Sequence, residues 1–293
     1  MTWPSPFDLQ FMRLALVAGL VVGACAPLIG TFLVQRRMSL MGDGVGHIAF
    51  AGIAGGLLLD VWPIWSALVA AVGGALWIER LRGRGQASGD LALALLFYSG
   101  IALGVVLLGL AGSLNANLFA YLFGSILTVT VGDVVVVALI GLLVVATMGL
   151  CGRALFSIAI DEDAARVAGL PVDVLNALLA ALTAVTVVAA MRVVGVLLVA
   201  ALMVLPVASG RLLGRSFRAS VGWSVAVGTA SVVTGLLTAW FLALPPGGTI
   251  VLVAAALFTL VSVTNRKRTS RKEAEEETSG AAARRADQSC TYR

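Results

Sequence analysis

One short stretch of the sequence, GDGVGHIAFAG at 42–52, contains residue types that bind metal ions. It places Asp43 and His47 four residues apart, which puts both side chains on one face of a helix, and His47 is the only histidine in the chain. Carboxylate and imidazole are both zinc ligands, and imidazole suits first-row metals generally. Two ligands cannot close a structural site, so the pattern favours a transient site on an ion path. The simpler alternative stays open: Asp43 caps a helix and His47 only pairs with it inside a helix bundle.

A second motif, DEDAARVAGLPVDVLN at 161–176, has the composition of a short, well-bounded helix. Asp161 is a good N-cap, while Glu162 and Asp163 complement the positive end of the helix dipole. Gly169 supplies a stop, and the proline that follows prevents continuation. Such a helix of about two turns has two interpretations: a solvated linker, or a knob that docks on a cytosolic partner.

The motifs of common enzymes are absent from the sequence. There is no GxxxxGK[ST] phosphate loop, no HExxH and no GxSxG elbow, so the chain is not expected to hydrolyse ATP itself. The three cysteines have neither a CxxC spacing nor an even framework, which argues against disulfides and structural metal sites. Thr130 and Asp133 have the spacing of a capping box at the start of a helix.

The elements that must position these motifs are membrane helices. Hydrophobic residues make up 60% of the 293 residues and charged residues 12%, and the mean hydropathy is +1.02. Because about 20 helical residues cross a bilayer, we predict an all-α polytopic membrane protein with eight or nine transmembrane helices. The short apolar piece 117–127 does not reach across the membrane and is expected to be re-entrant or interfacial. The predicted spans are 9–34, 40–60, 62–79, 90–111, 132–150, 175–191, 193–210, 221–243 and 247–264.

The net charge of +5 is explained by topology. Most arginines fall in every second connection between spans and form no patch for nucleic acid, so the positive-inside rule assigns these connections to the cytoplasm. With nine crossings the N-terminus lies outside and the C-terminus in the cytoplasm. Residues 1–264 form the membrane domain, and the polar segment 265–293 is predicted to be a disordered cytoplasmic tail.

Five stretches together resemble a known family, and they follow its order across nearly the whole membrane part. The chain is similar to the membrane permease subunit of zinc and manganese uptake ABC transporters, and most similar to the zinc, ZnuB-type branch. The stretches are RRMSLMGDGVGHIAFAGIAGGLLLD at 36–60, LFAYLFGSILTVT at 118–130, DEDAARVAGL at 161–170, VVGVLLVAALMVLPVASGRLL at 193–213 and PPGGTIVLVAAALF at 245–258.

The resemblance implies roles for particular residues. Asp43 and His47 become the metal ligands of a path between permease halves. Pro206 is expected to break a helix beside that path, although Val207 and Gly210 depart from the family pattern. The segment 161–170 becomes the coupling helix that fits a groove of the ATPase, and its residues in that role are Asp161, Glu162, Asp163, Ala164, Arg166 and Gly169.

The function that the resemblance implies is the permease subunit of an ATP-driven importer of divalent metal in the bacterial plasma membrane. No cofactor is bound permanently, and Zn²⁺ or Mn²⁺ is cargo. The expected partners are a cytosolic ATPase subunit, an extracytoplasmic metal-binding protein, a second copy of the chain and membrane lipid, without nucleic acid. A manganese or iron permease, an ion-coupled secondary transporter and a membrane scaffold are the alternatives. A secondary transporter would need intramembrane carboxylates, for which Asp43 is the clear candidate.

Overall fold

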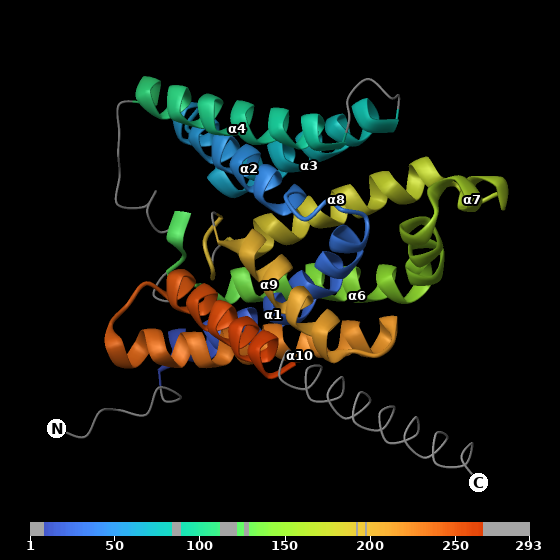
Figure 1. Ribbon diagram of the computed structural model, residues 1–293. Coiled ribbons are helices and arrows are strands. Elements are labelled where there is room, and N and C mark those ends of the chain that lie inside the picture. The colour runs from blue at the N-terminus through green and yellow to red at the C-terminus, as the bar shows by residue number, and fades with distance from the viewer. Residues whose placement is uncertain are drawn as a thin grey trace, which may run out of the picture.

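The computed structural model describes residues 9–83, 89–111, 122–125, 129–191, 193–196 and 198–265, and all regular structure within these ranges is helical (Figure 1). Eight of the helices are long and apolar enough to cross a membrane. The prediction of an all-α polytopic membrane protein is therefore confirmed. The helices are α1 Gln10–Gln35, α2 Met41–Leu58, α3 Pro63–Gly83, α4 Gly89–Ala111, α6 Val131–Ile160, α7 Glu162–Val167, α8 Val172–Ala190, α9 Val199–Leu213, α10 Phe217–Leu242 and a last helix Pro246–Asn265.

The seventh predicted span, 193–210, is helical only in its second part. The 15 residues of α9 rise about 22 Å, which is shorter than the roughly 30 Å hydrocarbon layer. The described residues just before it, 193–196, are not helical, and Gly195 has a φ of 88°. Irregular backbone at membrane depth is tolerated only where protein or a water-filled cavity surrounds it. This segment is therefore a feature of the interior of the bundle.

The helix α6 begins where the sequence predicts and ends later. Thr130 and Asp133 form the expected capping box: the Thr130 hydroxyl accepts from the Asp133 amide at 3.2 Å, and the Asp133 carboxylate accepts from the Thr130 amide at 2.9 Å. The helix then continues ten residues beyond the predicted end at 150, because Leu155 and Ile158 are buried and give its last turns a packing surface.

Two groups of helices are joined through α8. Figure 1 shows α2, α3 and α4 together on one side and α1, α6, α9 and α10 on the other, with α8 passing between them. Buried residues make up 67% of α1, 72% of α2 and 67% of α8 in their most apolar stretches, against 22–28% in α3, α4, α6 and the last helix. The helix that carries Asp43 and His47 is thus central, and the outer helices present apolar surface to lipid or to another subunit.

The arginine-bearing ends of the helices meet on one face of the molecule, which we call the arginine face. It comprises the α1–α2 connection, the end of α3, α7 and the α9–α10 connection. The contacts that join these ends are Arg36–Glu162 at 3.3 Å, Arg82 to the Met38 sulfur at 3.0 Å, the Phe32–Phe217 rings at 5.6 Å and Asn265 to the Leu212 carbonyl at 3.2 Å. Their grouping agrees with the sequence-based assignment of these connections to one side of the membrane.

Some predictions fall on residues outside the described ranges. The tail beyond 265 lies outside them, as do residues 117–121 and 126–127 of the short apolar piece 117–127.

Candidate metal path

The two predicted ligands lie together on the first two turns of α2. His47 Nε2 is 3.7 Å from Asp43 Oδ1, and the two side chains are 11% and 29% exposed. Two zinc bonds of 2.0–2.2 Å at a tetrahedral angle place their ligand atoms about 3.4 Å apart, so a shift of a few tenths of an ångström lets both side chains bind one ion. No group of three or more potential metal-binding side chains occurs among the described residues. Among the described residues, Asp43 and His47 thus have no third side chain of this kind beside them.

The α4 helix holds His47 from one side. The ring of Phe97 meets the imidazole edge to face, with ring centroids 4.4 Å apart and an interplanar angle of 76°. One turn further along, Gly100 lies directly against the backbone of His47, where a Cβ would be 2.9 Å from the His47 carbonyl carbon. The glycine therefore permits the close approach of α4 that places the aromatic ring on the imidazole.

The glycines of the GDGVG stretch bring the start of α9 against α2. A Cβ at Gly42 would be 3.0 Å from the Met203 sulfur, and one at Gly46 would be 3.0 Å from the carbonyl oxygen of Val196. Because glycine has no Cβ, a backbone comes close to α2 at these positions. Val196 belongs to the non-helical segment before α9, so the metal pair lies beside interrupted backbone, the arrangement typical of transporter binding sites.

The non-helical segment is itself held by a junction of three backbones. Gly124 and Gly195 have φ angles of 76° and 88°, which favour glycine. A Cβ at Gly124 would overlap the Val193 carbonyl, and one at Gly247 would overlap the Val194 carbonyl. The start of the last helix and the segment around Gly124 thereby fix the backbone that runs past His47.

Pro206 does not break a helix, which corrects the expectation from the sequence. It is buried inside α9, which continues from Val199 to Leu213. Proline removes one backbone donor, but buried membrane helices tolerate this loss because neighbouring groups satisfy the freed carbonyl. The interruption instead lies in the preceding segment, next to Gly195.

The short helix predicted in the segment 161–170 is present as α7, on the arginine face. Asp161 caps it, since its carboxylate accepts from the Ala164 amide at 2.9 Å. Gly169 follows the helix with a φ of 82°, as expected for a glycine stop. Asp163 and Ala164 are exposed. α7 is therefore a short helix whose outer side chains are exposed.

Two side chains of α7 have roles that the sequence did not reveal. Glu162 turns inward and pairs with Arg36, whereas Val167 is 90% exposed. Exposed Arg166 pairs with Asp173 at 3.0 Å. The sequence shows that Val167 is an apolar side chain at the end of a polar helix, but not that it is exposed. The sequence held no signal for the Glu162 pair, because its partner is 126 residues away.

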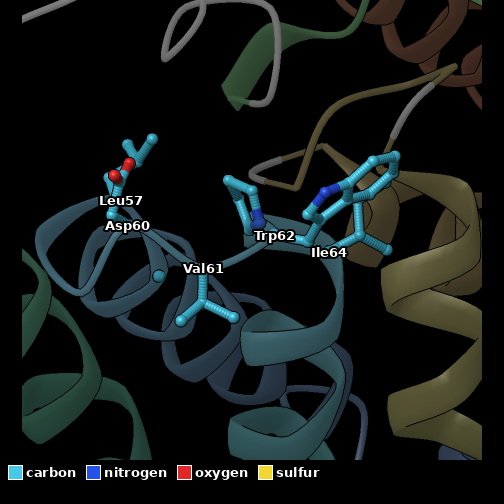
Figure 2. Close-up of a pocket in the computed structure, with 7 residues that line it drawn as sticks. Leu57, Asp60, Val61, Trp62 and Ile64 are labelled. Atoms are coloured by element: carbon cyan, nitrogen blue, oxygen red, sulfur yellow. The ribbon is translucent and has the colours of Figure 1, made fainter.

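A cavity of about 480 Å³ lies far from the metal pair, at the turn that joins α2 to α3. Figure 2 shows Asp60, Trp62 and Ile64 among the residues that line it. Asp43 and Leu57 are separated by 14 residues of α2, which is about 21 Å. Among the described residues that line it, Asp60 is the one acidic side chain.

The comparisons with known proteins agree with this geometry. Residues 8–265 match the ABC 3 transport family. The chain belongs to this family. It is 30% identical over 246 residues to the high-affinity zinc uptake system membrane protein ZnuB of Haemophilus influenzae, covering 84% of this chain and 94% of that protein. It is also 30% identical over 251 residues to the manganese import system permease protein ScaB of Streptococcus gordonii, covering 86% and 90%.

A solved structure has the same fold. PsaBC from Streptococcus pneumoniae, in complex with Fab, superposes with a TM-score of 0.77 at 30% identity, over 87% of this chain and 92% of that one. The ABC 3 protein described here is therefore a metal-transport ABC permease and a multi-pass protein of the bacterial inner membrane. Permeases of this family work with a substrate-binding protein and a separate ATPase subunit, and the permease itself is not an enzyme.

Proposed function

We propose that this permease imports a divalent metal ion, zinc in the first place, by alternating access, with Asp43 and His47 as transient ligands. The observation that carries the proposal is the Asp43–His47 pair itself, 3.7 Å apart and largely buried in the central helix of the bundle. Burying ionisable groups in a membrane costs at least about 3 kcal/mol per charge, so such groups are functional by default.

The depth of the pair supports this role. Gly42 lies level with Met203, which is eight residues, or about 12 Å, from Arg211 at the arginine-bearing end of α9. His47 lies about 7 Å further along α2, so the pair spans the central part of a hydrocarbon layer about 30 Å thick.

The partners complete the proposed cycle. An extracytoplasmic protein delivers the ion to the outer mouth, and the ATPase acts on α7 at the arginine face. We propose a homodimer, in keeping with the apolar faces that α3, α4 and α6 leave exposed. The C-terminus is assigned to the cytoplasm, and the bond from Asn265 to the Leu212 carbonyl beside Arg211 supports this.

Manganese is the second candidate cargo. The zinc and manganese relatives are equally similar to this chain, at 30% identity. The Val196 carbonyl beside Gly46 is an oxygen donor of the kind that manganese accepts, whereas imidazole favours zinc. Direct competition between the two ions during uptake decides between them.

The test uses metal-starved cells that lack other zinc and manganese uptake systems and express the wild-type permease, His47→Gln or Asp43→Asn at matched membrane levels. We expect zinc uptake to fall at least about tenfold in both variants, because even the loss of an outer-shell partner of a metal ligand costs about 10–100-fold in affinity. Asp60→Asn is the matched control: it removes a carboxylate at the other end of α2, where a φ of 56° suits asparagine.

Each of the following results would overturn a different part of the proposal. Normal uptake by His47→Gln or Asp43→Asn would remove that residue from the path. Uptake of manganese but not zinc by the wild type would overturn the choice of cargo. Unchanged uptake of both metals when the gene is deleted would refute the importer itself.

A further inference from the structure

The first residue of the coupling helix, Glu162, points into the permease and contacts four elements. Its carboxylate is 3.3 Å from Arg36 at the end of α1 and 3.7 Å from Arg82 near the end of α3. It accepts a hydrogen bond of 3.2 Å from the amide of Asn176 on α8, and it is 3.7 Å from Arg166 on its own helix. Glu162 is therefore the side chain that ties α7 to the ends of α1, α3 and α8.

Three charged side chains of this cluster are largely buried, so each depends on the opposite charges beside it. The side chains of Arg36, Arg82 and Glu79 are 5%, 17% and 7% exposed. Burial, followed by repulsion from Arg82, lowers the pKa of Arg36, and Glu79 and Glu162 oppose the change. Arg36 and Arg82 face the carboxylates of Glu79 and Glu162, and the more exposed Arg166 is a third cation beside Glu162. Removing one member of such a cluster leaves an uncompensated charge, which is strongly destabilising for that arrangement.

The same cluster leads to the helix that carries the metal pair. Arg82 uses one nitrogen for Glu79 and Glu162 and the other, Nη1, for the sulfur of Met38 at 3.0 Å. Met38 is buried, and its carbonyl accepts from the amide of Met41, the first residue of α2. Asp43 follows two residues later. A continuous series of contacts therefore joins α7 to the start of the metal helix.

We propose that Glu162 is not an ATPase-docking side chain but the link that passes the displacement of α7, through Arg36 and Arg82, to the start of α2 and the metal pair. This inference rests on the proposed function of the permease. The exposed Asp163, Ala164 and Val167 form the outer surface of α7, which is free to contact the ATPase. Glu162, at 39% exposure, is accessible enough for its pairs to open and close during a cycle.

The test compares two adjacent arginines in the full complex of permease and ATPase, reconstituted in liposomes with its metal-binding protein. Arg36→Gln removes a partner of Glu162, whereas Arg37→Gln makes the same change at an exposed residue with no ion pair in the described part of the chain. The readouts are zinc uptake, ATP hydrolysis and the amount of ATPase bound. We expect Arg36→Gln to keep hydrolysis and assembly but to lose about tenfold in zinc moved per ATP, and Arg37→Gln to match the wild type.

A double-mutant cycle isolates the link from general damage. Because Glu162→Gln breaks the same pair, the double variant with Arg36→Gln is expected to lose about as much uptake per ATP as either single variant, and not the product of the two losses. The exchange variant, Arg36→Glu with Glu162→Arg, restores a pair of opposite charges and is expected to recover part of the coupling. It also keeps the inference testable if a single variant does not fold.

Each remaining outcome has a definite meaning. If the wild-type complex moves no metal, the proposed function is refuted, and with it the role of Glu162 in coupling. If the wild type transports and Arg36→Gln couples as well as Arg37→Gln, the link is refuted. Loss of ATPase binding in Glu162→Gln but not in Arg36→Gln would overturn it in favour of direct docking by Glu162, as would losses that multiply in the double variant.

Discussion

Gly100 of α4 lies directly against the backbone of His47, so replacing this glycine tests whether the spacing of α2 and α4 positions Asp43 and His47. In Gly100→Ala the new Cβ would lie 2.9 Å from the His47 carbonyl carbon and the Ile48 nitrogen, and 3.1 Å from the His47 Cβ. Ordinary contacts of this kind are 3.4–4 Å long. The α2 and α4 helices must therefore separate by about 0.5–1 Å at this point, because backbone atoms cannot turn aside as flexible side chains do.

The expected loss follows from that displacement. Overpacking of this size costs about 1–3 kcal/mol of stability. The tolerance of a metal–ligand distance is about 0.2 Å, which is smaller than the shift, so we expect metal uptake to fall about tenfold or more. Gly109→Ala is the matched control on the same helix: a Cβ there meets nothing within 4 Å, and alanine improves helix propensity by up to about 1 kcal/mol.

The assay measures zinc uptake in cells at matched membrane levels and the thermal midpoint of the purified permease in detergent. Gly100→Ala should be lower than Gly109→Ala in both. Equal midpoints and equal uptake would show that α2 and α4 adapt without cost, which contradicts the reasoning from spacing. A lower midpoint with full uptake would instead show that His47 does not have to keep its place for transport.

Two further glycine substitutions test the backbone junction and the coupling helix. In Gly247→Ala the new Cβ would overlap the Val194 carbonyl, so we expect a lower thermal midpoint and reduced uptake. Gly248→Ala, which has open space around it, should match the wild type. Equal behaviour of the two variants would disprove the junction. Gly169→Val places a β-branched residue at a φ of 82°, where strain of about 1–2 kcal/mol or more opposes the end of α7. The amount of zinc moved per ATP should therefore fall relative to Gly152→Val, which changes a helical glycine with equal free space. Unchanged coupling would contradict a docking role for α7.

Hydropathy predicted the helices well because lipid imposes a length on each apolar run. Hydropathy gave wrong helix boundaries where contacts within the protein, and not the thickness of the bilayer, decide where a helix begins or ends. Nothing in CGRALFSIAI at 151–160 stops a helix, so α6 extends to Ile160 and buries Leu155 and Ile158. Conversely, the residues around Gly195 are as apolar as a span but not helical. The backbone that surrounds them holds that conformation, and hydropathy alone does not describe such contacts.

The proximity of Asp43 and His47 was predictable because the two residues lie four positions apart on one helix. The surroundings were not, since Phe97, Gly100 and Val196 reach His47 and Gly46 from other elements. The coupling helix shows the same limit, because its cap and its stop are local but the inward turn of Glu162 depends on arginines far away in the sequence.

Asp43 and His47 lie where the two groups of helices meet, so the proposed alternating access would act on their surroundings directly. The α2 helix packs with α3 and α4, while its glycines Gly42 and Gly46 lie against the α9 segment of the other group. A movement of one group past the other must therefore change what surrounds Asp43 and His47. Such a site, with two protein ligands and an environment that changes, binds an ion weakly in any one state. We expect discrimination between zinc and manganese to depend chiefly on the protein that delivers the ion, because affinity alone would favour zinc at any histidine and carboxylate pair.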